Sequence, residues 1–206
     1  MKNNQSPLTY LALGDSYTIG EGVEQVHSFP FQLTLRLRQK GLPVEFPEVV
    51  ATTGWTTGEL LNALEKKKLD TKFNIVTLLI GVNNQYRGYS KEQYREEFFT
   101  LVRKAIAYSL HGASHVFVLS IPDWGVTPFA EGRDRDVIRR EINEFNQINW
   151  EEASRAGVNY TDITAISRQV PLYPSWLTHD QLHPSGEMYE QWVEKLLPLV
   201  LKSVEQ

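Results

Sequence analysis

Two segments in the middle of the chain, FNIVTLLIG at residues 73–81 and SHVFVLSIP at residues 114–122, are nearly unbroken runs of apolar and β-branched residues. A half-exposed strand alternates apolar and polar residues, whereas a central strand of a parallel sheet is covered on both faces and reads as a continuous apolar run. Three further short segments of strand-like composition lie at residues 8–14, 44–51 and 157–163. The sequence therefore predicts a sheet of about five strands whose central members are parallel.

Between these strands lie segments whose apolar residues are spaced three and four positions apart, as on one face of a helix. They predict helices at residues 30–39, 57–67, 90–112, 136–156 and from about 185 to 201. Strands that alternate with helices through short loops indicate an α/β fold with a parallel sheet and right-handed crossovers.

In such folds, ligands bind outside the carboxyl ends of the strands. A functional site is therefore expected in the loops that follow the strands, at residues 14–22, 51–57, 81–89, 122–134 and 163–184.

Length, charge and composition limit the number of domains, the kind of partner and the catalytic residues that this chain can have. A chain of 206 residues suffices for one buried core, and we expect a single domain over residues 1–206. The formal net charge of -4 argues against a nucleic-acid partner. The chain has no cysteine, which excludes disulfides, thiolate metal ligands and cysteine nucleophiles.

The sequence also bears on membrane insertion and location. The apolar run before Gly14 is too short for the core of a signal peptide, and no segment approaches the roughly 20 apolar residues of a membrane span. We therefore expect no stable membrane insertion. A cytoplasmic location is the default expectation, although a chain from which a leader had been removed would look the same.

The first post-strand loop contains the stretch ALGDSYTIGEG at residues 12–22. A phosphate-binding loop needs a lysine beside its second glycine, but here Glu21 follows Gly20, and the glycine spacing does not fit the dinucleotide fingerprint. The glycine-x-serine-x-glycine elbow of other hydrolases is absent too, because Thr18 replaces its second glycine. What remains is Ser16 at the rim of the sheet, either as a nucleophile or as an ordinary turn residue.

A serine nucleophile needs a base, and the chain has five histidines. His111 and His115 flank the start of a strand, which is the wrong end of a parallel sheet for catalysis. His27 has no carboxylate at a favourable spacing. The two remaining histidines lie in the late segment SWLTHDQLHPSGEMY at residues 175–189.

In that late segment, Asp180 and His183 are three residues apart, and one helical turn would place their side chains on the same side. His179 is adjacent to Asp180, so those two side chains diverge in a turn. A carboxylate bonded to the imidazole Nδ1–H leaves Nε2 free to accept the proton of Ser16. Two alternatives stay open: Asp123 as the orienting acid, and a purely structural role in which Asp180 caps a turn.

Acyl transfer also requires hydrogen-bond donors for the oxyanion of the tetrahedral intermediate. Gly54, in the loop ATTGWTTGEL, lets the backbone approach a substrate and present its N–H. In the loop LIGVNNQYRG, Gly81 turns the chain and Asn83 supplies a side-chain amide. Each of these is a common turn residue on its own. The prediction of an oxyanion hole therefore rests on their occurring together, after the second and third strands.

The sequence resembles the SGNH hydrolases, the GDSL-type esterases and lipases. Four blocks carry this resemblance in the family's order, and they extend over nearly the whole chain: GDS at residues 14–16, Gly54, GVNN at 81–84 and DQLH at 180–183. The resemblance implies a flavodoxin-like, three-layer α/β/α sandwich with a central parallel sheet. It also implies a serine hydrolase that cleaves an ester through an acyl-enzyme, with no metal and no organic cofactor.

Position by position, the resemblance implies that Ser16 is the nucleophile, His183 the general base and then acid, and Asp180 the carboxylate that orients it. The oxyanion hole would combine the backbone N–H groups of Ser16 and Gly54 with the side chain of Asn83.

The chain departs from the family's pattern at two places. Residue 84 is Asn where the family usually has Asp, and Tyr17 and Thr18 follow the serine in place of the leucine of the name motif. We expect Asn84 to alter hydrogen bonding in its loop without abolishing catalysis.

The substrate is expected to be a small-molecule ester, either a lysophospholipid or lipid ester, or a small ester or acetylated carbohydrate. Four aromatic residues in post-strand loops are candidates for substrate binding: Tyr17, Trp55, Tyr86 and Trp124. A non-catalytic acyl- or carbohydrate-binding module on the same fold is the competing class. Metal-dependent hydrolysis through Asp15, Asp180 and His183 is a third possibility, but it leaves Ser16, Gly54 and Asn83 unexplained. The sequence does not determine an oligomeric state.

A polar leaving group has its own candidates. Arg87 and the loop DWGVTPFAEGRD, residues 123–134, follow the third and fourth strands, where they are placed to contact a sugar or a lipid head group.

Overall fold

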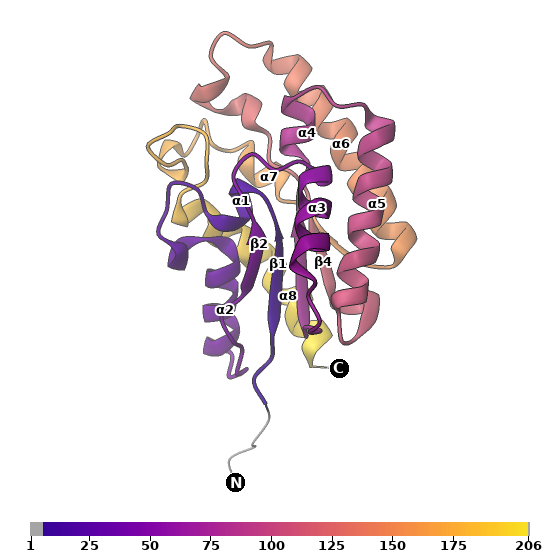
Figure 1. Ribbon diagram of the computed structural model, residues 1–206. Helices are drawn as coiled ribbons and strands as arrows, with labels where there is room; N and C mark the ends of the chain where they lie inside the picture. Colours follow the sequence, from indigo (N-terminus) through magenta and orange to yellow (C-terminus); the bar gives the residue numbers. More distant parts are fainter. Residues whose placement is uncertain (1–5, 206) are drawn as a thin grey trace.

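The computed structural model describes residues 6–205 and has a central sheet with helices on both faces (Figure 1). The prediction about a leader depends partly on residues 1–5, which lie outside the described residues. Within residues 6–205, no helix has the length and apolar character needed to cross a bilayer.

The sheet consists of five parallel strands in the order β2-β1-β3-β4-β5. The strands are β1 (Tyr10–Gly14), β2 (Glu48–Ala51), β3 (Ile75–Leu79), β4 (Val116–Leu119) and β5 (Asn159–Thr161). Every residue of β1, β3 and β4 is buried, which explains their continuous apolar sequences. The five-stranded parallel sheet is thus confirmed.

The strands are shorter than the apolar segments that predicted them. Isolated bridges pair Leu8 with Val44 and Phe73 with Ser109, so the chain runs beside its neighbour before the regular ladders begin. Apolar composition reports burial, which extends beyond the hydrogen-bonded part of a strand.

The long helices form two layers, one on each face of the sheet (Figure 1). One layer contains α2 (Phe29–Gln39) and α8 (Gly186–Val204), which pack against each other. In the other, α3 (Thr57–Lys67) and α6 (Arg135–Ala156) both pack against α5 (Lys91–Tyr108). The three-layer α/β/α architecture is therefore confirmed.

Short helices that the apolar periodicity did not predict occupy the loops, because three to five residues are too few to display a helical period. The α-helical ones are α1 (Ser16–Ile19), α4 (Val82–Tyr86) and α7 (Thr164–Ser167). The 3₁₀ helices are η1 (Gln25–His27), η2 (Gly112–His115), η3 (Trp124–Val126), η4 (Pro128–Ala130) and η5 (Pro174–Trp176).

The strand order creates a crevice at the carboxyl ends of β1 and β3. From β1 the chain moves to one side to form β2, and then returns to form β3 on the other side of β1. The loops after β1 and β3 therefore diverge at this switch point, where ligands bind in open α/β sheets. Helix α1 follows β1 there, and α4 follows β3.

Gly14 allows the two strands to meet closely at this point. A Cβ atom on Gly14 would overlap the carbonyl oxygen of Leu79 at the end of β3 and the hydroxyl of Thr18 in α1. Only glycine fits, so the glycine before Asp15 and Ser16 has a packing reason.

Candidate active site

Ser16, His183 and Asp180 form a continuous hydrogen-bonded chain. Ser16 begins α1 at the carboxyl end of β1, and its Oγ lies 3.0 Å from Nε2 of His183. The other ring nitrogen of His183, Nδ1, lies 2.6 Å from Oδ2 of Asp180. The serine and histidine side chains are buried, and the Asp180 side chain is 31% exposed. A base is thus positioned on a hydroxyl, with a carboxylate behind it.

An Asx-type turn, and not a turn of helix, brings Asp180 and His183 together, which corrects the local geometry expected from their spacing. Oδ1 of Asp180 accepts hydrogen bonds from the backbone N–H groups of Leu182 and His183, both at 2.9 Å, and from the Thr178 hydroxyl at 2.7 Å. Gln181 takes a left-handed conformation with φ of 60°. These bonds leave Oδ2 free for the imidazole.

The same bonds determine the charge of Asp180. Burial alone would raise the pKa of this carboxyl, but the hydrogen bonds from the His183 ring, the backbone and the Thr178 hydroxyl outweigh it. The pKa of Asp180 is therefore held well below its ordinary value, and the group is ionised at neutral pH.

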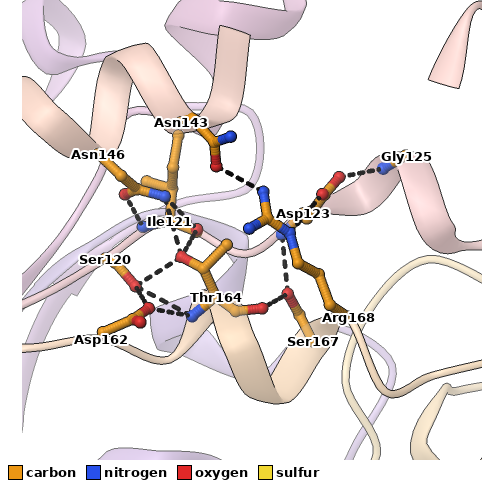
Figure 2. Close-up of polar contacts among 10 residues, drawn as sticks. All are labelled: Ser120, Ile121, Asp123, Gly125, Asn143, Asn146, Asp162, Thr164, Ser167 and Arg168. Carbon is orange, nitrogen blue, oxygen red and sulfur yellow. Dashed lines mark hydrogen bonds and ion pairs between the residues drawn. The ribbon is translucent and has the colours of Figure 1, made fainter. Parts of the chain in front are cut away.

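Asp123, the alternative acid, is committed to other partners (Figure 2). Its Oδ2 accepts from Nε of Arg168 at 2.9 Å, its Oδ1 accepts from the N–H of Gly125 at 3.0 Å, and its own N–H donates to Oγ of Ser167 at 2.9 Å. In the structure, Asp180 contacts His183, whereas Asp123 caps the start of η3.

The three predicted oxyanion donors come from neighbouring loops. In the described part of the chain, the N–H groups of Ser16 and Gly54 have no hydrogen-bond partner. Nδ2 of Asn83 donates to the carbonyl of Trp55 at 2.9 Å, which ties α4 to the loop of Gly54 and leaves the second amide hydrogen available. Gly54 has φ of 83°, a left-handed conformation that favours glycine.

This geometry agrees with the comparison against protein families. A family model described as the GDSL-like Lipase/Acylhydrolase family matches residues 12–191. The chain belongs to this family. The resemblance inferred from its sequence blocks is confirmed, and the protein is a hydrolase that acts on ester bonds.

Solved structures share the fold of this GDSL hydrolase at low sequence identity. TesA has a TM-score of 0.74 and 19% identity, with 95% of this chain and 99% of that chain covered. Axe2, an acetylxylan esterase from Geobacillus stearothermophilus, has a TM-score of 0.72 and 20% identity, with 95% and 94% covered. The psychrotrophic esterase EstA from Pseudoalteromonas sp. has a TM-score of 0.72 and 16% identity, with 96% and 99% covered. A search of curated protein sequences finds no match.

Asn84, where the GDSL family usually has aspartate, joins two loops of the site through one threonine. Its Oδ1 accepts the backbone N–H of Thr57 at 3.0 Å, and its Nδ2 donates to the Thr57 hydroxyl at 2.7 Å. That hydroxyl in turn donates to Glu97 on α5. Because Glu97 takes the hydroxyl proton, residue 84 must be a donor here, and an amide satisfies this requirement where a carboxylate does not.

We expect Asn84→Asp to lower the free energy of unfolding by about 1–3 kcal/mol, because two carboxylates would then compete for the single proton of the Thr57 hydroxyl. Urea unfolding followed by circular dichroism measures the effect. Adding Glu97→Gln should restore most of the loss, since the glutamine amide can donate to Thr57. Adding Glu96→Gln, an exposed neighbour that does not touch Thr57, should restore nothing. Equal behaviour of the two double variants would contradict this account.

Arg87, the candidate for contact with a polar leaving group, binds the Gly54 loop. Its Nη2 donates to the carbonyl of Gly54 at 2.6 Å, and its Nη1 lies 3.3 Å from Oε2 of Glu59. Glu59 also completes the capping box of α3 by accepting the N–H of Thr56 at 2.8 Å. The backbone of this loop is thereby fixed through the carbonyl group of Gly54.

An apolar cavity of about 150 Å³ opens beside Ser16, Asn83 and His183. Six residues with apolar surfaces line the rest of it: Tyr17, Val82, Tyr86, Trp124, Phe129 and Leu182. Of the four aromatic residues proposed from the sequence, Tyr17, Tyr86 and Trp124 are among them. Trp55 is not among the lining residues.

Of the residues considered for a metal mechanism, Asp180 and His183 contact each other. Within residues 6–205, no three His, Cys, Asp or Glu side chains gather in an arrangement suited to a metal ion. Asp15 is buried and caps the N-terminus of α1, where its Oδ1 accepts the N–H of Tyr17 at 3.0 Å. Burial raises the pKa of Asp15 to about 7, against which its backbone hydrogen bonds act only partly.

Sequence reasoning missed several contributors to this site. Thr178, which fixes Oδ1 of Asp180, lies two residues before it and carries the hydroxyl typical of such turns. Phe129 falls in the loop after β4 that had been considered for a leaving group. Glu97 had no local signal, because its contact with Thr57 spans 40 residues.

Proposed function

We propose that this protein is a serine esterase that hydrolyses small-molecule carboxylic esters through an acyl-enzyme intermediate. The observation that carries the proposal is the pair of contacts on His183, 3.0 Å from Nε2 to Ser16 Oγ and 2.6 Å from Nδ1 to Asp180 Oδ2. A histidine so held has its proton on Nδ1 and its lone pair directed at the serine hydroxyl.

In the first half-reaction, Ser16 Oγ attacks the ester carbonyl while its proton passes to Nε2 of His183. The oxyanion accepts hydrogen bonds from the N–H groups of Ser16 and Gly54 and from the amide of Asn83. The carbon–oxygen bond to the alcohol then breaks, and His183 gives its proton to the departing alkoxide. Asp180 stabilises the imidazolium that exists between these steps.

In the second half-reaction, water attacks the acyl-enzyme and gives a proton to Nε2 of His183. The bond to Ser16 Oγ breaks, the serine regains its proton from His183, and the carboxylic acid leaves. The same donors serve both tetrahedral intermediates, so one arrangement of side chains accounts for the whole cycle.

Two comparisons support the proposal. The chain belongs to a family of lipases and acylhydrolases, and its fold is shared with an esterase, EstA, that is inhibited by monoethylphosphonate. A phosphonate ester forms a stable adduct with an activated serine, as expected for nucleophilic catalysis.

Labelling with a fluorophosphonate probe tests the proposal. We expect one covalent adduct per chain, located at Ser16 by mass spectrometry of the peptides, and turnover that is unaffected by a metal chelator. A chain that stays unlabelled while a chelator abolishes its hydrolysis would support the metal mechanism instead. A chain that is unlabelled and inactive on all esters would support the non-catalytic binding module.

A further inference from the structure

We propose that the cavity beside Ser16 is an acyl pocket which admits about six carbon atoms, so that the substrates are esters of short-chain acids or of benzoic acid. This inference rests on the proposed serine-esterase function and adds the class of acyl group. It follows from the size of the cavity, from how firmly its walls are held and from where its open side lies.

The size of the cavity sets the limit on the acyl group. Its volume of about 150 Å³ equals that of an apolar protein cavity known to hold benzene. The six lining residues other than Ser16, Asn83 and His183 carry no formal charge. A butyryl, hexanoyl or benzoyl group therefore matches both its volume and its chemistry.

The side chains that form the floor of the cavity are fixed by close packing and by hydrogen bonds. Tyr17, Val82 and Trp124 are 3%, 6% and 4% exposed, so each is packed on nearly all sides and its side chain has little room to move. Nε1 of Trp124 donates to Oε1 of Gln85 at 2.7 Å, and Nε2 of Gln85 donates to Glu141 on α6 at 2.8 Å. This chain of bonds fixes the indole in place.

The backbone that carries Trp124 is braced as well (Figure 2). Asp123, directly before it, bonds to Arg168 and to the N–H of Gly125, as described above. Arg168 is itself held by Oδ1 of Asn143 at 2.6 Å. Widening the pocket on this side would break the charge-assisted bonds of Arg168 and leave the buried carboxylate of Asp123 without its partner, which costs more than a longer acyl chain gains.

The rim of the cavity is aromatic and open to solvent. Tyr86 is 44% exposed and Phe129 is 45% exposed, and their ring centroids lie 6.5 Å apart. Carbon atoms beyond about the sixth would lie over the exposed edges of these rings and stay largely in water, so they would add little binding free energy.

The order of the two half-reactions assigns the pocket to the acyl group and not to the alcohol. The alcohol must leave before water attacks, whereas the acyl group stays bound to Ser16 through both steps. An apolar pocket retains the acyl group, which stays bound, whereas the alcohol, which must leave, benefits from an open path.

The test begins with p-nitrophenyl esters of acetate, butyrate, hexanoate, octanoate, dodecanoate and benzoate. We expect kcat/KM of the wild-type protein to rise about two- to fourfold per added methylene up to hexanoate, and then to level off or fall. A second series, with acetate as the acyl group and alcohols from methanol to hexanol, should change kcat/KM by less than about threefold overall.

Two variants should change the acyl series in opposite ways. Phe129→Ala removes one wall, and should reduce the hexanoate-to-acetate ratio of kcat/KM by about three- to tenfold. Val82→Phe fills the floor, and should move the optimum to acetate. The matched control is Phe46→Ala, a phenylalanine that is 49% exposed, precedes β2 and stacks on Phe31, and it should leave the series unchanged.

The outcomes separate this inference from the proposed function. If Phe129→Ala and Val82→Phe change the alcohol series and leave the acyl series unchanged, the pocket binds the alcohol and the inference is wrong. Dodecanoate hydrolysed faster than hexanoate by the wild-type protein would also overturn it. Neither result affects the serine mechanism, which is tested separately by fluorophosphonate labelling and by the dependence of hydrolysis on Ser16.

Discussion

Replacing Ser16 with alanine is expected to lower kcat for p-nitrophenyl acetate by about 10⁴- to 10⁶-fold. The variant keeps the oxyanion donors, His183 and the apolar cavity, but it has no atom that can form the acyl-enzyme. What activity remains would come from water attacking an ester bound in the site. Steady-state kinetics, with active-site titration of the wild-type protein, measures the loss.

The control for this variant is Ser114→Ala, which removes an exposed hydroxyl at the opposite end of the sheet, beside β4. It should retain full activity. Urea unfolding of Ser16→Ala should remain within about 1 kcal/mol of the wild-type protein, because the lost hydrogen bond involves a single partner on His183. A folded Ser16→Ala protein with more than a tenth of wild-type kcat would rule out Ser16 as nucleophile.

Replacing Asp180 with asparagine is expected to lower kcat by about 10³- to 10⁴-fold, while KM changes by less than about threefold. The asparagine carbonyl can keep the three bonds that Oδ1 accepts from Thr178, Leu182 and His183. Its amide then faces Nδ1 of the imidazole, which must become the acceptor. The ring proton moves to Nε2, and His183 can no longer accept the proton of Ser16.

The pH profile of kcat tests whether protonation of the Asp180 carboxylate contributes to the difference between the wild-type protein and the variant. The pKa of Asp180 lies well below its ordinary value, so the carboxylate loses its charge only as the pH falls far below about 4. The ratio of wild-type to Asp180→Asn kcat should therefore be constant above about pH 8, beyond the range in which a histidine changes charge. The matched control Asp70→Asn, at an exposed site beyond α3, should leave kcat unchanged. A ratio that varies with pH in this range would contradict the assignment.

The regular elements of this protein were predictable because burial on both faces leaves a simple pattern. The runs at residues 73–81 and 114–122 predicted β3 and β4, and the helix predicted at residues 57–67 has those bounds in α3. The short helices of the loops escaped prediction because a single turn has no measurable period. Ser16 and Asn83 lie in these short helices. The apolar periodicity therefore gave little information on the local structure of the site.

The site was found from residue types and their order, but its local geometry was not. The spacing of Asp180 and His183 suggested a helical turn, and the structure has an Asx-type turn with Gln181 in a left-handed conformation. Both arrangements bring residues three positions apart together, so spacing alone does not distinguish them. The side-chain acceptor that closes the turn, Oδ1 of Asp180, is visible only in three dimensions.

The sequence by itself determined the fold class and the chemical groups available to this protein: a parallel α/β sheet, and a serine, a histidine and amide donors in the post-strand loops. The tertiary structure decided which carboxylate faces His183: Asp180 contacts its ring, whereas Asp123 is paired with Arg168. It also decided the size of the cavity, whose walls come from four separate segments of the chain. Contacts such as that of Ser16 with His183, 167 positions apart, depend on the path of the whole chain, and no local pattern records them.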